Sequence, residues 1–307
     1  MYKQVIFIVV LAQQLILANQ DNSEKELRLH FDINKTIIAM DTVQGKGLEE
    51  TINGILAEFT FAKWDGNHEQ SYYAYITDRL AEQNPELSRS DEKFKTKRAV
   101  LLKDFSLYLK QYPALLMQYQ DDKSCMLKIL GDGEMVIFPS FFKVIAWLDI
   151  HYPNKYAIYL RTFGQDLPEV VPAIEKITSL RFAGQGEFQE KNLSLLGKEE
   201  TLHDFFNGKN AQHYAIRDDY TYWKSQGFQA IGGKPFPLDI DNSNVISIFF
   251  DDNANDPDKP IIYPIGLDNR LEDIAELLKN GNVVAVNPKQ AILDEDYFIK
   301  RILILLS

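Results

Sequence analysis

The chain has 307 residues, 45% of them hydrophobic and 25% charged, a composition that excludes a disordered or collagen-like chain. Its 33 lysine and arginine residues against 44 aspartate and glutamate residues give a formal charge of −11. Sequence-independent nucleic-acid binding needs a cationic surface and is therefore not expected. The single cysteine, Cys125, excludes an intrachain disulfide, and we expect it to be a small buried residue.

The first 18 residues have the pattern of a secretory signal peptide. Lys3 precedes an apolar stretch at 5–12, and Ala18 ends a second apolar run before the polar residues from Asn19 onward. The alternative interpretation is an ordinary N-terminal helix. A permanent membrane span needs about 20 unbroken apolar residues, so no stable span is expected. We expect a secreted, periplasmic or lumenal protein if the leader is cleaved, and a cytoplasmic protein otherwise.

The rest of the chain alternates short apolar runs with segments of helical periodicity. This alternation predicts an α/β fold in which helices cover both faces of a sheet. The first two predicted strands are separated by a mostly helical segment, with helices at 49–60, 70–83 and 94–112 and a hairpin-like stretch at 125–138. The predicted strands are 27–33, 156–160, 213–216, 245–250, 260–265 and 283–286, and the remaining helices are 141–151, 271–279 and 294–305.

Polar residues follow three of the predicted strands. The first strand leads into Asp32 and the segment 33–36, the second ends in Thr162, and the third leads into the acidic stretch 251–256. Lys234, in a Gly-Gly-Lys-Pro sequence, lies between the last two. Each feature alone is explained by turn chemistry. Their common place at strand ends, where open α/β sheets bind ligands, predicts a site.

The order Asp…Thr…Lys…Asp-Asp-x-x-x-Asp resembles that of the haloacid dehalogenase superfamily of phosphatases and phosphotransferases, over about residues 27–256. The resemblance implies a Rossmann-like three-layer α/β core with a parallel sheet and a mostly helical cap inserted after the first motif. The family's cap closes over the site and excludes water. The expected division is a signal peptide at 1–18, a core at 19–46 and 136–307, and a cap at 47–135.

The resemblance also implies the chemistry. Asp32 matches the family's nucleophile, Thr162 the hydroxyl that holds a phosphoryl oxygen, and Lys234 the lysine that neutralises charge. The implied activity is a phosphohydrolase that requires Mg²⁺ and acts on a small phosphorylated substrate through an aspartyl-phosphate on Asp32.

The magnesium ligands implied by the resemblance are all oxygens, as this ion prefers. Asp252 and Asp256 match the acidic motif, and Asp32 and the main-chain oxygen of Asn34 complete the set. Asp251 or Asp256 would act as a further ligand.

One position departs from the family's phosphatases. They carry an aspartate two residues after the nucleophile as the general acid and base, and here that position is Asn34. An amide cannot transfer the proton, a role that contributes about 10² to 10⁴ in rate. The alternatives are slow turnover of poor leaving groups, a phosphotransferase, or a catalytically impaired binding or scaffold protein on the same fold.

Two basic residues remain open candidates. Lys224 also precedes the acidic motif at a spacing that the family tolerates, but it falls on a helix-like segment where a solvated charge is expected. Arg161 neighbours Thr162, yet consecutive residues of a strand point to opposite faces. Lys234 is preferred, since the glycines before it allow close backbone approach.

Overall fold

The computed structural model divides the chain into two compact units. The core unit contains the described residues up to Ile37, together with Ser140–Asn287 and Glu295–Ser307, and the insertion unit contains Ile38–Pro139 and Pro288–Asp294. The expected signal peptide lies outside the described residues. These are 25–39, 47–66, 68–89, 91–131, 136–195, 197–201, 205, 211–268 and 270–307.

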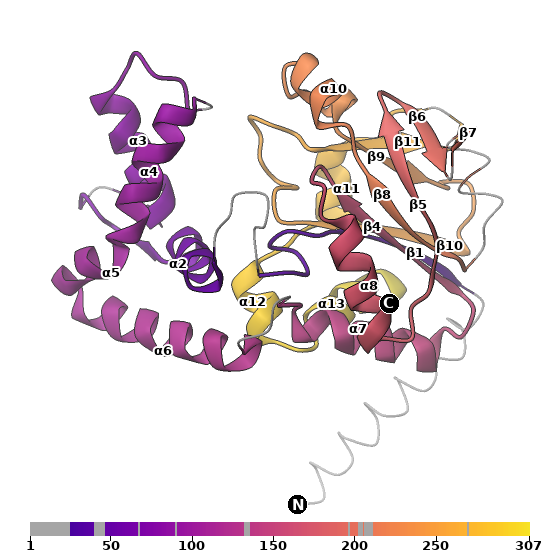
Figure 1. The fold of residues 1–307 in the computed structure, drawn as a ribbon, viewed down its shortest axis with the longest axis horizontal. Helices are drawn as coiled ribbons and strands as arrows, with labels where there is room; N and C mark the ends of the chain where they lie inside the picture. Colours follow the sequence, from indigo (N-terminus) through magenta and orange to yellow (C-terminus); the bar gives the residue numbers. More distant parts are fainter. Residues whose placement is uncertain are drawn as a thin grey trace, which may run out of the picture. The chain divides into compact units, whose positions relative to one another are not determined.

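The core unit is built on an eight-stranded, mostly parallel sheet, as the α/β prediction requires (Figure 1). Its order is β12-β10-β1-β4-β8-β5-β6-β7, and β6 is antiparallel to both of its neighbours. The strands are β1 (Glu26–Asp32), β4 (Tyr156–Thr162), β5 (Phe182–Gln189), β6 (Asn192–Leu195), β7 (Lys198–Glu200), β8 (His213–Arg217), β10 (Val245–Asp251) and β12 (Val283–Ala285).

Strand β1 is covered on both faces. Its Phe31 ring lies 4.7 Å from Phe250 on the neighbouring strand and 5.2 Å from Phe298, whereas His30 stacks on Phe249 at 5.3 Å on the other face. Leu27, Leu29 and Phe31 alternate with Arg28 and His30, and this period of two is typical of a strand, which explains why β1 was predictable within one residue at either end.

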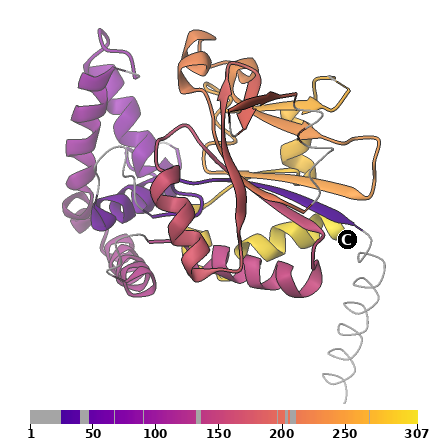
Figure 2. The same cartoon turned by 45° about the vertical axis from the view of Figure 1, so that its right-hand side comes forward.

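Helices and a small second sheet form the covering layers. Helices α7 (Pro139–His151) and α13 (Tyr297–Leu306) lie on one face of the sheet (Figure 2). The other face packs against α11 (Ile274–Asn280), α10 (Tyr220–Ser225) and the parallel pair β9 (Lys234–Leu238) and β11 (Ile262–Gly266). The remaining core elements are α8 (Leu167–Ile177) and η3 (Ala230–Gly232).

The prediction for 260–265 requires a correction. This segment is a strand, but β11 pairs with β9 in a separate sheet and not with the central one. Strand β9 was not predicted, because Pro235 and Pro237 argue against a strand in the middle of a sheet. In a two-stranded ribbon every strand is an edge, so prolines are tolerated there.

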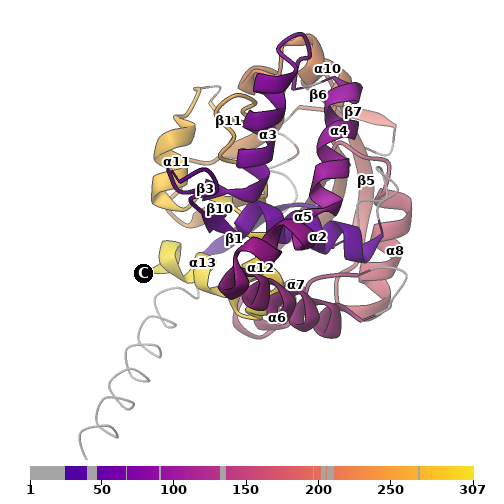
Figure 3. The same ribbon diagram turned by 90° about the vertical axis from the view of Figure 1, so that its left-hand side faces the viewer.

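The insertion unit is mainly helical, as predicted, and α3 and α4 lie side by side in it (Figure 3). The chain of this unit also returns at α12, which contacts α2 and α6. The helical insertion expected at 47–135 did not include this C-terminal segment, Pro288–Asp294. The elements are α2 (Leu48–Phe59), β2 (Phe61–Ala62), β3 (Gln70–Ser71), α3 (Tyr72–Gln83), α4 (Glu92–Lys103), α5 (Phe105–Tyr108), η2 (Leu109–Gln111), α6 (Pro113–Leu130) and α12 (Pro288–Leu293).

Three expectations for the insertion unit were wrong. The single helix expected at 94–112 is divided into α4, α5 and η2. The hairpin-like stretch at 125–138 begins inside α6, which continues to Leu130 and stops at Gly131, whose φ of 66° suits glycine. Cys125 lies exposed on this helix and is not buried.

No helix in the described part of the chain is long and apolar enough to cross a membrane.

Candidate functional site

The strand order creates a switch point between β1 and β10. From β1 the chain adds β4 and then β8 on one side, whereas β10 and β12 extend the sheet on the other side. At such a point the crossover connections diverge and leave a crevice outside the carboxyl ends of the strands. Asp32 ends β1 and Asp251 ends β10, so the fold itself places two carboxylates at the carboxyl ends of the strands beside this switch point.

A third carboxylate and a buried lysine complete the cluster. Carboxylate oxygens of Asp32, Asp251 and Asp252 lie within 4.8 Å of one another. Lys234 donates through Nζ to Asp32 Oδ1 at 2.5 Å and to Asp251 Oδ2 at 2.7 Å. Only 1% of Lys234 is exposed. The lysine therefore joins the two strand ends as a buried cation.

Glycine allows this lysine to reach the site. A Cβ at Gly233 would lie 2.3 Å from the carbonyl oxygen of Ile261, and the next residue, Lys234, donates its own backbone N–H to that oxygen at 2.7 Å. Only glycine permits this close approach. The Gly-Gly-Lys sequence thus joins the end of η3 to the first residue of β9.

Thr36 links the first motif to the acidic motif. Its hydroxyl lies 3.4 Å from Asp32 Oδ2 as donor and accepts the backbone N–H of Asp252 at 3.2 Å. In the turn between the end of β1 and Thr36, Lys35 has a φ of 57°, in the left-handed region. This local geometry fixes the spacing between the nucleophile candidate and the acidic loop.

Thr162 and Asn34 meet at a carboxylate that the sequence interpretation did not include. Asp166 accepts the hydroxyl of Thr162 on Oδ1 and the side-chain amide of Asn34 on Oδ2, both at 3.0 Å. Thr162 also accepts the backbone N–H of Gly164 at 2.8 Å. Asp166 holds the N-cap position of α8 but its side chain does not cap that helix. The feature of the sequence that could have identified Asp166 is its position four residues after Thr162.

Arg161 is a structural residue of the core. It is fully buried and forms a bidentate ion pair with Asp218, whose Oδ2 lies 3.1 Å from Nε. Its Nη1 donates to the carbonyl oxygen of Pro235 at 2.8 Å. The arginine therefore anchors β9 to the central sheet beside the cluster. Asp218, which follows β8, was also missed.

The remaining candidates lie apart from the cluster. Lys224 is exposed on α10. Asp256 Oδ1 accepts the backbone N–H groups of Asp258 at 2.9 Å and Lys259 at 3.2 Å, within its own loop. Among the described residues, the group of three neighbouring carboxylates consists of Asp32, Asp251 and Asp252, and it does not include Asp256.

Burial dominates the electrostatics of the cluster. It raises the pKa of Asp32 to about 7, against the opposing effect of Lys234, and the negative charges of Asp251 and Asp166 add to the rise. Burial alone would lower the pKa of Lys234, but the carboxylates of Asp251, Asp32 and Asp218 together raise it above its ordinary value. The lysine is therefore charged at neutral pH, and Asp32 is poised between its two protonation states.

The donor set of the cluster fits a hard divalent cation. Three carboxylates within 4.8 Å face a single ammonium group, so the cluster has an excess of negative charge that a bound cation would offset. Carboxylate and carbonyl oxygens are the ligands that Mg²⁺ accepts. Both oxygens of Asp251 accept close hydrogen bonds, from Lys234 at 2.7 Å and from the backbone N–H of Asn253 at 2.9 Å. Asp32 accepts from Lys234 on Oδ1, but the contact of Thr36 with its Oδ2 is long, at 3.4 Å, so Oδ2 of Asp32 is the more available oxygen.

Comparison of the chain with family models, with curated proteins and with solved structures found no match.

Proposed function

We propose that this chain is a Mg²⁺-dependent phosphohydrolase of the haloacid dehalogenase type, with Asp32 as its nucleophile. The proposal rests on one observation above all. Asp32, Asp251 and Asp252 meet a buried Lys234 at the carboxyl ends of adjacent parallel strands. Phosphoryl transfer depends on positioning and on cationic stabilisation of oxygen charges, and this arrangement offers both.

In the proposed reaction a carboxylate oxygen of Asp32 attacks the phosphorus of a small phosphorylated substrate. The bond between phosphorus and the leaving oxygen breaks, and that oxygen takes a proton from water. A second water then attacks the phosphorus of the aspartyl-phosphate, which releases inorganic phosphate and restores Asp32. Lys234 keeps the Asp32 carboxylate oriented by the contact at 2.5 Å.

Mg²⁺ would be held by Asp32, Asp252 and the main-chain oxygen of Asn34, with Asp251 beside them. When bound, the ion supplies charge neutralisation between the nucleophile and the phosphate. A phosphoryl oxygen accepts hydrogen bonds but does not donate them. Thr162 can therefore bind it only after its hydroxyl turns the proton away from Asp166.

Phosphate release from acetyl phosphate and p-nitrophenyl phosphate tests the proposal. The chain without residues 1–18 is assayed with magnesium and with EDTA. We expect release that requires magnesium and is faster for acetyl phosphate, the better leaving group. Absence of release from both substrates in magnesium would contradict the proposal.

Replacing Asn34 by aspartate is expected to raise the rate on p-nitrophenyl phosphate by about 10-fold or more. The new carboxylate would lie where an amide now donates to Asp166 at 3.0 Å. Two carboxylates at such a short distance share a proton, because they cannot both be ionised. The variant thus gains the acid that the chain lacks. Measurement of kcat for both substrates checks this, with less gain expected for acetyl phosphate.

The double variant Asn34→Asp with Asp166→Asn provides the control. This variant again has one amide and one carboxylate at the contact, but the carboxylate now lies at position 34 and the amide at position 166. We expect it to lose most of the gain on p-nitrophenyl phosphate, because the amide at position 166 would donate to the new carboxylate and keep it ionised, while the stability of the parent protein is recovered. An equal gain on both substrates would point to a change in binding instead of proton transfer.

Magnesium is expected to bind about tenfold more tightly at pH 8 than at pH 6. The cation competes with the proton on Asp32, whose pKa of about 7 lies between these values. Isothermal titration calorimetry in buffers of different ionisation enthalpy measures the affinity and the protons released. The Asp32→Asn variant should show no such pH dependence. A wild-type affinity that does not change with pH would contradict the assignment of Asp32 as a ligand.

A binding or scaffold protein on the same frame is the second candidate. It is favoured by Asn34, whose amide is engaged with Asp166 and offers no proton transfer. Magnesium binding without turnover of either substrate would support this candidate.

We also propose that the leader is removed and that the mature protein begins at Asn19. N-terminal sequencing of protein from its native source tests this, and retention of Met1 would contradict it.

A further inference from the structure

Asp166 is a buried carboxylate near the proposed nucleophile, and the reaction described above assigns it no step. Only 6% of the residue is exposed. Burial raises the pKa of Asp32 and the negative charge of Asp166 adds to the rise, so the two carboxylates are within electrostatic reach of each other. The main-chain oxygen of Asp166 accepts the N–H groups of Glu169 and Val170 at the start of α8, at 3.0 and 2.9 Å. Its side chain does not cap that helix and contacts the residues of the site instead.

Both side-chain oxygens of Asp166 act as hydrogen-bond acceptors. Oδ1 accepts the hydroxyl of Thr162 and Oδ2 accepts the side-chain amide of Asn34, each at 3.0 Å. A carboxyl group that accepts on both oxygens has the hydrogen-bond pattern of its ionised form, which can take up a proton but has none to give. Asp166 is therefore suited to the role of a base, and not to that of an acid for the leaving oxygen.

The hydroxyl proton of Thr162 couples this carboxylate to the phosphoryl group. The hydroxyl oxygen accepts the backbone N–H of Gly164 at 2.8 Å, and its one proton can be donated to Asp166 or to a phosphoryl oxygen, but not to both. Binding of the phosphoryl group thus removes a donor from Oδ1, whereas Asn34 still holds Oδ2. A buried acceptor that loses its donor is costly, and a water molecule that donates to Oδ1 offsets this cost.

We propose that Asp166 is the general base of the second step, in which it takes a proton from the water that attacks the aspartyl-phosphate. This inference rests on the function proposed above. A water that donates to Oδ1 lies beside the Thr162 hydroxyl, and hence beside the phosphoryl oxygen that this hydroxyl binds. Asn34, which cannot transfer a proton, orients the carboxylate that takes it.

The step balances without any further reactant. The water oxygen forms a bond to phosphorus while the bond between phosphorus and the Asp32 oxygen breaks, and the electron pair of that bond returns to the Asp32 carboxylate. One proton of the water passes to Oδ1 of Asp166, and the other stays on the phosphate that is released. Asp166 then gives its proton to solvent, and Thr162 can donate to Oδ1 again.

Quenched-flow measurement with radiolabelled acetyl phosphate and magnesium tests the proposal on the full chain, because it measures formation and hydrolysis of the phosphoenzyme separately. In Asp166→Asn we expect formation within about threefold of the parent rate and hydrolysis about 100-fold slower, so that phosphoenzyme accumulates. The substitution is close to isosteric. The Asn34 amide can turn its oxygen toward the new amide, so the hydrogen bond between the two positions can be kept. Thermal melting by circular dichroism verifies that the variant is folded.

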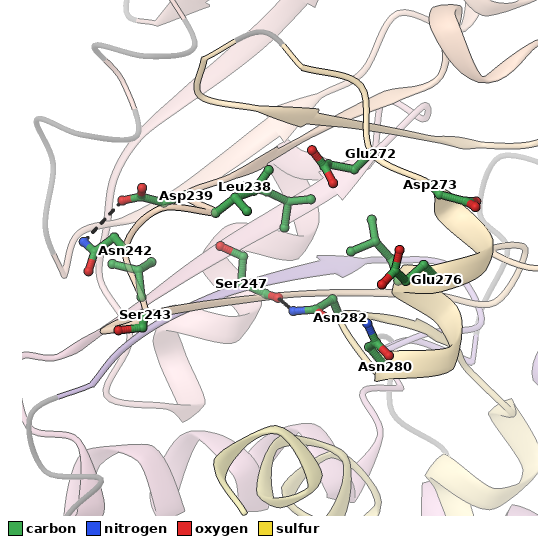
Figure 4. A pocket seen from close by; sticks show the side chains of 13 residues that line it. Leu238, Asp239, Asn242, Ser243, Ser247, Glu272, Asp273, Glu276, Asn280 and Asn282 are labelled. Carbon is green, nitrogen blue, oxygen red and sulfur yellow. Dashed lines mark hydrogen bonds between the residues drawn. The ribbon is translucent and has the colours of Figure 1, made fainter.

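Two exposed glutamates provide matched controls for the loss of a carboxylate. Glu169 lies in the first turn of α8, three residues after Asp166. Glu276 lines a hollow of about 280 Å³ near the start of β10 (Figure 4), and none of the residues that line this hollow belongs to the carboxylate cluster. Glu169→Gln and Glu276→Gln should each leave both rates within about twofold of the parent.

Comparison of the two rates separates a base from a structural contact. If Asp166 only holds Thr162 and Asn34 in place, Asp166→Asn should slow formation as much as hydrolysis. That result would overturn the inference, as would hydrolysis at the parent rate, and both would leave the proposed function standing. Absence of a phosphoenzyme in the parent chain would instead overturn the proposed function, and the inference with it.

Discussion

The Asp32→Asn variant is expected to release phosphate at least about 10⁴-fold more slowly than the parent chain, because an amide cannot form the phosphoryl-enzyme bond. The substitution is close to isosteric and Lys234 retains its contact with Asp251 at 2.7 Å. The fold is therefore expected to survive. Initial rates with acetyl phosphate at saturating magnesium measure the effect.

The matched control for this variant is Asp258→Asn. Asp258 is exposed in the acidic loop, outside the cluster of three carboxylates. Its loss should change kcat by less than about twofold, since exposed substitutions far from special features have small effects. A rate for Asp32→Asn within tenfold of the parent would show that another residue carries the reaction.

The Lys234→Met variant is expected to lower the free energy of unfolding by about 3–5 kcal/mol, because it leaves buried carboxylates without their cation. Lys234 is 1% exposed and Asp251 is fully buried, so solvent cannot replace the lost charge. The loss should shrink at acid pH, because Asp32 then takes up a proton; its pKa is about 7 in the parent protein and rises further once Lys234 no longer opposes the rise. Urea unfolding in EDTA at pH 8 and pH 5 measures both effects.

Lys224→Met is the control for the lysine. Lys224 is exposed on α10, and its replacement should change the free energy of unfolding by no more than about 0.5 kcal/mol. Similar losses for the two variants would show that Lys234 is not a buried bridge. Magnesium should restore part of the stability of Lys234→Met, since it supplies positive charge to the same carboxylates.

The strands that carry the site were predictable from the sequence for a clear physical reason. Strands β1, β4 and β10 are buried along most of their length and are rich in aliphatic and aromatic residues, with a polar residue at the carboxyl end, although Arg28 and His30 interrupt the apolar residues of β1. The position of Asp32 and Thr162 at strand ends followed directly. The approach of Lys234 to Asp32, across 202 positions of sequence, followed only from the resemblance.

Other parts of the site could not be predicted. Asp166 and Asp218 lie in loops after β4 and β8, and a loop aspartate is usually a cap or a turn residue. Their roles depend on the tertiary contacts to Asn34 and Arg161. Strand β9 was hidden by its prolines. The local sequence pattern indicates which residues end a strand, but it does not indicate which loop side chains come into contact in the folded protein.

Mapping a phosphoryl group on the protein tests the central claim most directly. The chain without residues 1–18 is mixed with acetyl phosphate and magnesium, quenched in acid and reduced with borohydride, which converts an aspartyl-phosphate to homoserine. Peptide mass spectrometry should find homoserine at position 32, and not in Asp32→Asn or in EDTA. Phosphate release with no modification at position 32 would contradict the aspartyl-phosphate mechanism.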